Sequence, residues 1–505
     1  MSTLAPVLMV QGTASSVGKS TLVAGLCRLL ARQGVRVAPF KAQNMSNNAA
    51  VCADGGEIGR AQFAQAVAAG VEATVDMNPI LLKPQPGGSQ VIVRGQLHGR
   101  RATSDYFGPS RRDLWPIVAE SLDRLRAQYD LVIAEGAGSP AEINLRIGDI
   151  VNMQVALHAR AEVLLVADID RGGAFAALLG TWEWLSPAER SLVHGFVLNK
   201  FRGDAALLEP APTLLQQRTG VPVIGVVPYL DELLLPEEDA ASLTEHKPRA
   251  AWLEIAVVRL PHLANFDEFA ALAAEPGVHL RWVTTPHELR APDLVILPGS
   301  KVTIRDLLWL HERGIAERVR WLATHGTPVL GICAGYQMLG NSVRDPDRVE
   351  SEHTHAAGLQ LLPIETELGG AKRLTRVHGR GHEHVPGIWS ALSGVSVEGY
   401  EIHVGRTSTL SPGLPPLFDL GAGQDGCVSD DGIVAGTYLH GILEQPDVRL
   451  ALLQALAFTR GFSLAPTQPS EVDPYDRLAT VLGDVLQLKQ TCVAPFLAAR
   501  GRAPA

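Results

Sequence analysis

The sequence predicts an α/β protein with two doubly wound, mainly parallel β-sheets, one in each half of the chain. Short runs rich in Val, Ile and Leu recur along both halves, and stretches with helical spacing of apolar residues separate them. Runs that are apolar throughout are typical of parallel strands buried on both faces, and their alternation with helices is typical of doubly wound sheets. A charged stretch with two prolines at 231–250 separates the two series.

The first series begins with the run VLMV and continues into a helical pattern over 19–32. Its strands are predicted at 7–10, 35–40, 130–136, 162–169, 194–200 and 221–229. The second series follows the charged stretch, with apolar runs at 253–260, 278–283, 293–300, 327–335, 394–405 and 432–441, and the strand of the run at 327–335 is predicted at 329–331. We therefore expect a first domain over 1–235, a linker over 236–250, a second domain over 251–460 and a helical tail over 461–505.

Composition and charge exclude several classes of function. The chain has 505 residues, is 46% hydrophobic and 19% charged, and carries a formal net charge of −9. It lacks the basic composition that nucleic-acid binding needs, and no run reaches the roughly 18 apolar residues of a membrane span. Its five cysteines form no C-x-x-C pair, which favours a reducing compartment. We expect a cytoplasmic protein that acts on small molecules, and the sequence is compatible with a homo-oligomer.

A glycine-rich loop follows the first predicted strand and opens the first predicted helix. Its sequence, GTASSVGKS at 12–20, ends in the Gly-Lys-Ser of a phosphate-binding loop, with one residue more than usual between the two glycines. Backbone N–H groups of such a loop face phosphates. An ordinary βα turn is the alternative, but it does not explain why Gly, Lys and Ser stand together where the helix begins. The predicted nucleotide-binding residues are Gly12, Thr13, Gly18, Lys19 and Ser20.

A carboxylate ends the predicted strand at 130–136. Glu135 is followed by Gly136, Ala137 and Gly138, so its side chain is expected at the carboxyl edge of the sheet, near the loop. A carboxylate and a hydroxyl are ligands that Mg²⁺ prefers. We therefore predict Ser20 and Glu135 as the Mg²⁺ ligands that accompany bound ATP.

Cys333 stands on a predicted bend between a strand and a helix. Small residues surround it, with Gly331 two positions before and Gly335 two positions after. Such a bend exposes a nucleophile, and the N-terminus of a helix stabilises a thiolate. A buried core cysteine is the alternative, but it does not require both glycines. The N–H of Ala334 and the backbone at Gly299 are the predicted donors to an oxyanion.

A thiol nucleophile needs a base, and the chain has 16 histidines. His440 stands out because it ends the apolar run at 432–441, which places it at the rim of a sheet. We predict that Cys333 and His440 form the catalytic pair.

Both motifs resemble known families. The loop is similar to that of dethiobiotin synthetase and its relatives, and the pattern G-x-C-x-G-x-Q, ending at Gln337, is similar to class I glutamine amidotransferase domains of flavodoxin-like fold. The second resemblance implies that Cys333 attacks the glutamine carboxamide and that Gly299, Ala334 and Gln337 bind glutamine or the oxyanion. That family places a glutamate two residues after the histidine. Here Ile442 stands there, so Glu444, Glu401 or no carboxylate orients the histidine.

Over nearly its whole length the chain resembles the cobyric acid synthase family. The stretches that carry this resemblance include FKAQNMSNNA (40–49), MNPILLKPQ (77–85), EGAGSPAEINLR (135–146), DIVNM (149–153), NKFRGD (199–204), PHLANFDEF (261–269), GYEIHVGRT (399–407) and YDRLA (475–479). The resemblance implies amidation of the b, d, e and g carboxylates of adenosylcobyrinic acid a,c-diamide to adenosylcobyric acid, in cobalamin biosynthesis. Glutamine, ATP and Mg²⁺ would be required, and the carboxylates would react as acyl phosphates.

Further residues are assigned through this resemblance. Lys41 is expected at the γ-phosphate or acyl phosphate, and Asn199 at the nucleobase. The predicted substrate residues are Asn44, Asn47, Lys83, Arg146 and Asp149. A polar turn is the alternative for the asparagines, and a surface or salt-bridge residue is the alternative for Lys83 and for Arg146.

Two other functions remain open at this point. Cobyrinic acid a,c-diamide synthase would use the same machinery on other corrin carboxylates. A partitioning-type ATPase or regulator would use the loop alone and would need no cysteine on a strand-to-helix bend.

Overall fold

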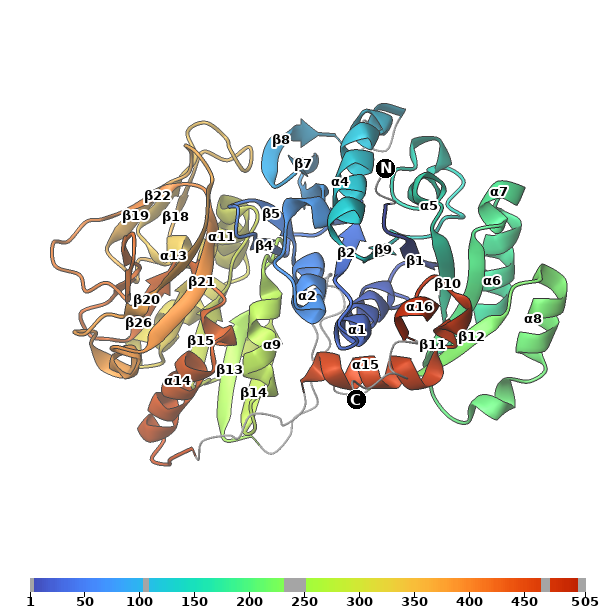
Figure 1. The fold of residues 1–505 in the computed structure, drawn as a ribbon. Coiled ribbons are helices and arrows are strands. Elements are labelled where there is room, and N and C mark those ends of the chain that lie inside the picture. The colour runs from blue at the N-terminus through green and yellow to red at the C-terminus, as the bar shows by residue number, and fades with distance from the viewer. Residues whose placement is uncertain (1–3, 103–108, 231–250, 465–472, 498–505) are drawn as a thin grey trace. The chain divides into compact units, whose positions relative to one another are not determined.

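The computed structural model describes residues 4–102, 109–230, 251–464 and 473–497 (Figure 1). Contacts within the chain divide it into two compact units. The first comprises 1–46, 52–235 and 470–505, and the second comprises 47–51 and 236–469. The predicted linker at 236–250 lies outside the described residues.

The first unit is built on a six-stranded parallel sheet with the order β12-β11-β10-β1-β9-β2. Its strands are β1 (Val7–Gly12), β2 (Val37–Lys41), β9 (Leu131–Glu135), β10 (Glu162–Asp168), β11 (Val193–Phe201) and β12 (Val223–Pro228). The prediction of a parallel, doubly wound sheet is confirmed for this half of the chain.

Both faces of this sheet are buried, as the continuous apolar runs predict. Along β1, Val7 and Met9 belong to one hydrophobic core, whereas Leu8 and Val10 belong to another. Helix α4 (Trp115–Gln128) contributes to the first of these cores, and helix α1 (Lys19–Ala31) contributes to the second. The helix that begins at the glycine-rich loop is therefore anchored on the central strand of the sheet.

The end of the chain completes the first unit. The helix α15 (Pro474–Val485) packs on α1, where Leu478 and Leu482 lie so close to Gly25 that a Cβ there would be 2.5 Å from Leu482 Cδ1. Arg28 forms ion pairs with Asp473 and Asp476. The predicted helical tail is thus in part a brace for the helix of the glycine-rich loop.

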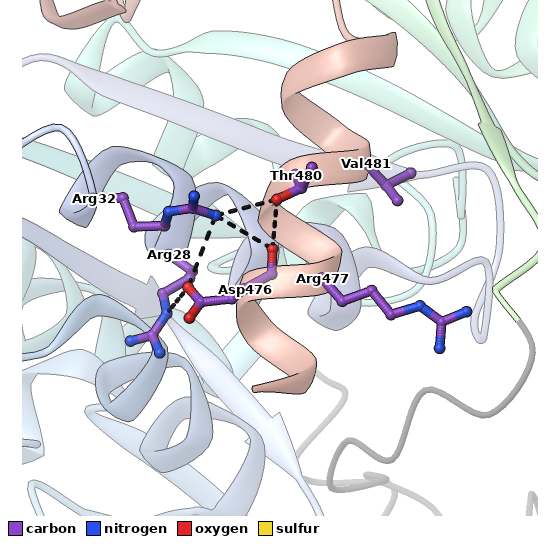
Figure 2. A pocket seen from close by; sticks show the side chains of 6 residues that line it. All are labelled: Arg28, Arg32, Asp476, Arg477, Thr480 and Val481. Atoms are coloured by element: carbon purple, nitrogen blue, oxygen red, sulfur yellow. Dashed lines mark hydrogen bonds and ion pairs between the residues drawn. The ribbon is translucent and has the colours of Figure 1, made fainter. Parts of the chain in front are cut away.

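An open surface pocket of about 650 Å³ lies beside this helix pair. Figure 2 shows the residues that line it: Arg28, Arg32, Asp476, Arg477, Thr480 and Val481. The side chain of Arg477 extends away from the ion pair of Arg28 and Asp476.

The second unit contains a six-stranded sheet with the order β14-β13-β15-β16-β26-β25, in which only β25 is antiparallel to its neighbour. Its strands are β13 (Leu253–Val258), β14 (Val278–Val283), β15 (Leu294–Leu297), β16 (Val329–Ile332), β25 (Cys427–Val428) and β26 (Val434–Thr437). The mainly parallel sheet predicted for this half is confirmed as well.

The predicted strand at 394–405 and the end of the predicted strand at 432–441 lie in another sheet. The run at 394–405 forms β21 (Ser396–His403), which belongs to a five-stranded sheet and pairs antiparallel with β20 (Arg373–Gly381) and β27 (Leu439–His440). Only its first residues alternate between exposed and buried, and Tyr400, Glu401 and Ile402 near its end are all buried. Among the residues that the structure describes, no helix is both long and apolar enough to cross a membrane.

Candidate active sites

The glycine-rich loop joins β1 to α1 in the first unit. Gly18 has φ 96°, a left-handed conformation that glycine adopts without strain. A Cβ at Gly12 would lie 2.6 Å from Val17 Cγ2, so a larger residue there would disturb the loop. No side chain caps the N-terminus of α1, and the N-terminal end of a helix favours an anion through its N–H groups and its dipole.

Lys19 and Ser20 connect the loop to the carboxyl end of β9. Lys19 Nζ donates hydrogen bonds to the carbonyl oxygens of Ala14 (2.9 Å) and Gly138 (3.2 Å). Ser20 Oγ donates to Glu135 Oε1 at 2.8 Å. The loop, the carboxylate and the turn after it therefore form one cluster, as their places at strand ends predict.

Glu135 accepts further hydrogen bonds from two buried side chains. Lys41 Nζ lies 2.8 Å from Glu135 Oε1, and Gln65 Nε2 lies 2.7 Å from Glu135 Oε2. Gln65 comes from α2 (Arg60–Ala69), and the sequence analysis did not single it out. These two hydrogen bonds hold the Glu135 carboxylate, and one of its oxygens faces Ser20 Oγ. Hydroxyl and carboxylate oxygens are hard ligands of the kind that fits Mg²⁺.

Asn199 lies against the loop. Its Nδ2 donates to the carbonyl oxygen of Val17 at 2.8 Å, and a Cβ at Gly18 would come within 2.2 Å of the same nitrogen. The next residue, Lys200, donates to the carbonyl oxygen of Ser16 at 2.7 Å. Asn199 therefore supports the loop, and its contact with a nucleobase stays a prediction.

The predicted cationic substrate residues have partners within the first unit. Lys83 forms a buried ion pair with Glu57, and Arg146 forms an ion pair with Glu189. The salt-bridge alternative thus describes both residues in this structure.

The polar substrate candidates are also hydrogen-bonded or placed elsewhere. Asn44 Nδ2 donates to Gln62 Oε1 at 2.9 Å, and Asp149 Oδ1 accepts from the N–H groups of Val151 and Asn152 before α5 (Met153–Ala159). Asn47 belongs to the second unit, and its Oδ1 is buried without a hydrogen bond.

In the second unit, Cys333 joins β16 to α13 (Ala334–Leu339) with φ 54° and ψ −109°. A positive φ is strained for a residue other than glycine and is typical of a nucleophile on a sharp strand-to-helix turn. The flanking glycines make this turn feasible. A Cβ at Gly335 would lie 1.9 Å from the carbonyl oxygen of Leu297, and a Cβ at Gly331 would lie 2.6 Å from Leu339 Cδ1.

His440 lies beside a carboxylate that the sequence analysis did not assign. Its Nδ1 is 3.0 Å from Oε1 of Glu268, a residue of the short helix η6 (Phe266–Phe269). Glu268 Oε2 also accepts from the N–H of Gly441 at 3.0 Å. Glu268 therefore occupies the place of the orienting carboxylate, whereas Glu401 forms an ion pair with Arg373.

The negative charge of the Glu268 carboxylate stabilises a positive charge on the buried His440 imidazole. Burial by itself would lower the pKa of His440, but the Glu268 carboxylate and a hydrogen bond and charge interaction with Cys333 outweigh it and raise that pKa to about 10. An imidazolium held in this way stabilises a thiolate on Cys333. The arrangement is able to attack a carbonyl carbon and to deliver a proton to the leaving group.

The predicted glutamine-binding residues lie around the same centre. A Cβ at Gly299 would be 3.1 Å from His440 Cε1, so this glycine lies against the imidazole ring. Ala334 begins α13 next to the nucleophile. Gln337 is buried and braces the site, because its Nε2 donates to the carbonyl oxygen of Val404 (3.1 Å) and to the Tyr438 hydroxyl (3.2 Å).

His403 is a second histidine beside Cys333 that the sequence analysis left without a role. It follows Ile402, whose carbonyl oxygen accepts from Cys333 Sγ at 3.6 Å, and its ring stacks on Tyr438 with centroids 3.8 Å apart. Burial, with Arg373 and His440 nearby, lowers the pKa of His403 to about 4. Its imidazole is therefore neutral near pH 7 and is a poor candidate for carrying a positive charge.

Replacing Glu268 with Gln is expected to lower kcat for glutamine hydrolysis roughly a hundredfold or more, because the amide no longer stabilises the His440 imidazolium. The raised pKa of about 10 keeps the His440 imidazole protonated up to about that pH in the parent protein. In the variant, the alkaline limb of the pH–rate profile moves to lower pH. Glu444→Gln is the control, and an equal loss in that variant would contradict the assignment.

Each half of the chain matches a known protein family. Residues 8–242 match the CobQ/CobB/MinD/ParA nucleotide binding domain, and residues 254–448 match the CobB/CobQ-like glutamine amidotransferase domain. A cobyric acid synthase of Desulforudis audaxviator is 50% identical over 496 residues, which cover 95% of this chain and 97% of that protein. One of Chloroflexus aggregans is 50% identical over 485 residues, covering 94% and 96%. The chain belongs to the cobyric acid synthase family of glutamine-dependent amidoligases in cobalamin biosynthesis.

Proposed function

We propose that the chain converts adenosylcobyrinic acid a,c-diamide to adenosylcobyric acid by amidating its b, d, e and g carboxylates, at the expense of glutamine and ATP. The observation that carries this proposal is the buried group of Cys333, His440 and Glu268 in a chain that also has a phosphate-binding loop beside Glu135. A regulator that only binds or hydrolyses ATP has no use for the first group.

In the glutamine reaction, the Cys333 thiolate attacks the carboxamide carbon. The N–H of Ala334 and the backbone at Gly299 are the proposed donors to the oxyanion. His440 gives its proton to the departing ammonia, which leaves a γ-glutamyl thioester. His440 then takes a proton from water, and hydrolysis of the thioester releases glutamate. Glu268 keeps the imidazole oriented in both steps.

In the ATP reaction, a corrin carboxylate attacks the γ-phosphorus, and ADP departs to leave an acyl phosphate. Ammonia then attacks the acyl carbon and displaces phosphate. The loop N–H groups, Lys19 and Lys41 are proposed to hold the transferred phosphoryl group and to neutralise its charge. Ser20 and Glu135 would hold Mg²⁺, which when bound supplies further charge neutralisation. Excluding water protects the acyl phosphate from hydrolysis.

For the corrin, Asn44 and Asn47 remain the proposed contacts to a rim that carries both amides and acids. Lys83, Arg146 and Asp149 are proposed to act indirectly, because their charged groups already bind Glu57, Glu189 and backbone N–H groups.

Mass spectrometry of an incubation with the a,c-diamide, ATP and amide-¹⁵N glutamine tests this function. We expect one labelled amide for each of the b, d, e and g positions, and no product without ATP. If the protein amidated cobyrinic acid but did not amidate the a,c-diamide, it would instead be an a,c-diamide synthase. Hydrolysis of ATP without any change in corrinoid mass would identify an ATPase without this chemistry.

A further inference from the structure

A short segment from the N-terminal half of the chain packs in the second unit, beside the helix that carries Glu268. This segment, 47–51, contains the strand β4 (Ala49–Val51). Asn48 Oδ1 accepts a hydrogen bond from the N–H of Phe266 at 3.2 Å, and Asn265 Oδ1 accepts one from the N–H of Ala49 at 3.0 Å. Both asparagines are buried. We call these two reciprocal hydrogen bonds the asparagine clamp.

The clamp acts on the start of η6. The N–H groups of the first turn of a helix have no partner within the helix, and Phe266 is the first residue of η6. Asn265, which precedes it with φ 54°, makes no side-chain cap of its own. Asn48 supplies the missing acceptor from 218 residues earlier in the chain. The cap of this helix is therefore not encoded in the sequence around it.

The other end of the segment is also fixed within the second unit. Arg376 Nε, from β20, donates to the carbonyl oxygen of Val51 at 2.8 Å. The segment 47–51 is thus held by the asparagine clamp near its start and by the bond from Arg376 at its end. The side chain of Asn48 therefore has a defined position from which to cap η6.

The position of η6 decides the geometry at His440. Glu268 is the third residue of η6, and its Oε1 lies 3.0 Å from His440 Nδ1. Both side chains are buried, so water cannot easily replace a lost contact. Hydrogen bonds weaken steeply when their distance and angle change, so a small shift of η6 would weaken the support of the imidazolium.

We propose that Asn48 is a positioning residue for glutamine hydrolysis, which holds Glu268 against His440 by capping η6. The proposal rests on the proposed function, since it takes Cys333 and His440 as the hydrolytic pair. It also gives the stretch 40–49 two tasks. Lys41 serves Glu135 in the first unit, and Asn48, seven residues later, serves the glutamine centre of the second.

The test is Asn48→Ala in the full-length enzyme. We expect kcat for glutamine hydrolysis to fall about tenfold with KM for glutamine little changed, because a lost cap displaces Glu268 without removing it. The alkaline limb of the pH–rate profile should move to lower pH, as for Glu268→Gln but by less. Amidation driven by ammonium chloride should keep its parent rate, since it bypasses hydrolysis. That rate shows that the first unit is folded, and a KM for glutamine close to that of the parent shows that the glutamine site of the second unit is formed.

Two variants sharpen the result. Asn48→Ser keeps an oxygen that is able to cap a helix and should recover part of the loss. Asn341→Ala, at an exposed asparagine of the same unit, should behave like the parent protein. An equal loss of ammonia-driven and glutamine-driven amidation, an unchanged rate of hydrolysis, or a lower rate with an unmoved alkaline limb would each overturn the proposal. Continued hydrolysis in Cys333→Ala would separately refute the proposed function.

Discussion

Cys333→Ala is expected to lower the rate of glutamine hydrolysis by about a thousandfold or more, because no other group can form the covalent thioester. ATP-dependent amidation should fall equally with glutamine as the nitrogen source. It should persist with ammonium chloride, because the synthetase reaction needs ammonia and not the thiol. Glutamate release and corrinoid mass, measured in the same samples, check both parts.

Cys427→Ala is the matched control for this substitution. Cys427 is also a buried cysteine of the second unit, where its Sγ accepts a hydrogen bond from the Tyr336 hydroxyl at 3.5 Å. Burial raises its pKa to about 11, so it is protonated near pH 7 and is not expected to react. Comparable glutamate release from Cys333→Ala and the parent protein would show that the strand-to-helix bend has no catalytic role.

Lys19→Ala should produce the opposite pattern. We expect ATP-dependent amidation to fall about a hundredfold or more with either nitrogen source, because a cation that stabilises the transferred phosphoryl group is lost. Glutamine hydrolysis should continue, since none of its proposed residues belongs to the first unit. Lys489→Ala removes the same charge from an exposed site of that unit and should leave amidation unchanged. Retained amidation in Lys19→Ala would exclude the phosphate role.

The local parts of both sites could be predicted because their residues are close in sequence. The loop at 12–20 and the bend around Cys333 each place a strand end, glycines and a reactive side chain within a few positions. Glu135 was predictable for a related reason, since parallel strands present their carboxyl ends at one edge of a sheet. Its hydrogen bond with Ser20 spans 115 residues, yet the strand pattern indicates it.

Glu268 could not be predicted by the same reasoning. It lies 172 residues before His440 and comes from a short helix rather than from a strand end. The carboxylates that the sequence offers for this role are Glu444, near the histidine, and Glu401, in the stretch GYEIHVG. Glu268 lies in the stretch PHLANFDEF, which resembles the family, but nothing in its spacing points to a particular histidine.

The cationic substrate candidates show a second limit of sequence analysis. A lone lysine or arginine does not reveal its partner, because ion pairs form between residues that only the fold brings together. Lys83 reaches Glu57, 26 residues away, and Arg146 reaches Glu189, 43 residues away. Likewise, the strand at 394–405 was recognisable as a strand, but its antiparallel partners depend on loops that follow no simple pattern.

The most direct test of the central claim is to trap the covalent intermediate. The protein is mixed with glutamine and quenched in acid within its first turnovers. It is then digested, and its peptides are mapped by mass spectrometry. The account predicts a γ-glutamyl group on Cys333 and on none of Cys27, Cys52, Cys427 and Cys492, with more of it in Glu268→Gln if breakdown of the thioester is slowed more than its formation. Active hydrolysis with the group on another cysteine, or with no thioester under any quench time, would contradict the claim that Cys333 liberates the ammonia.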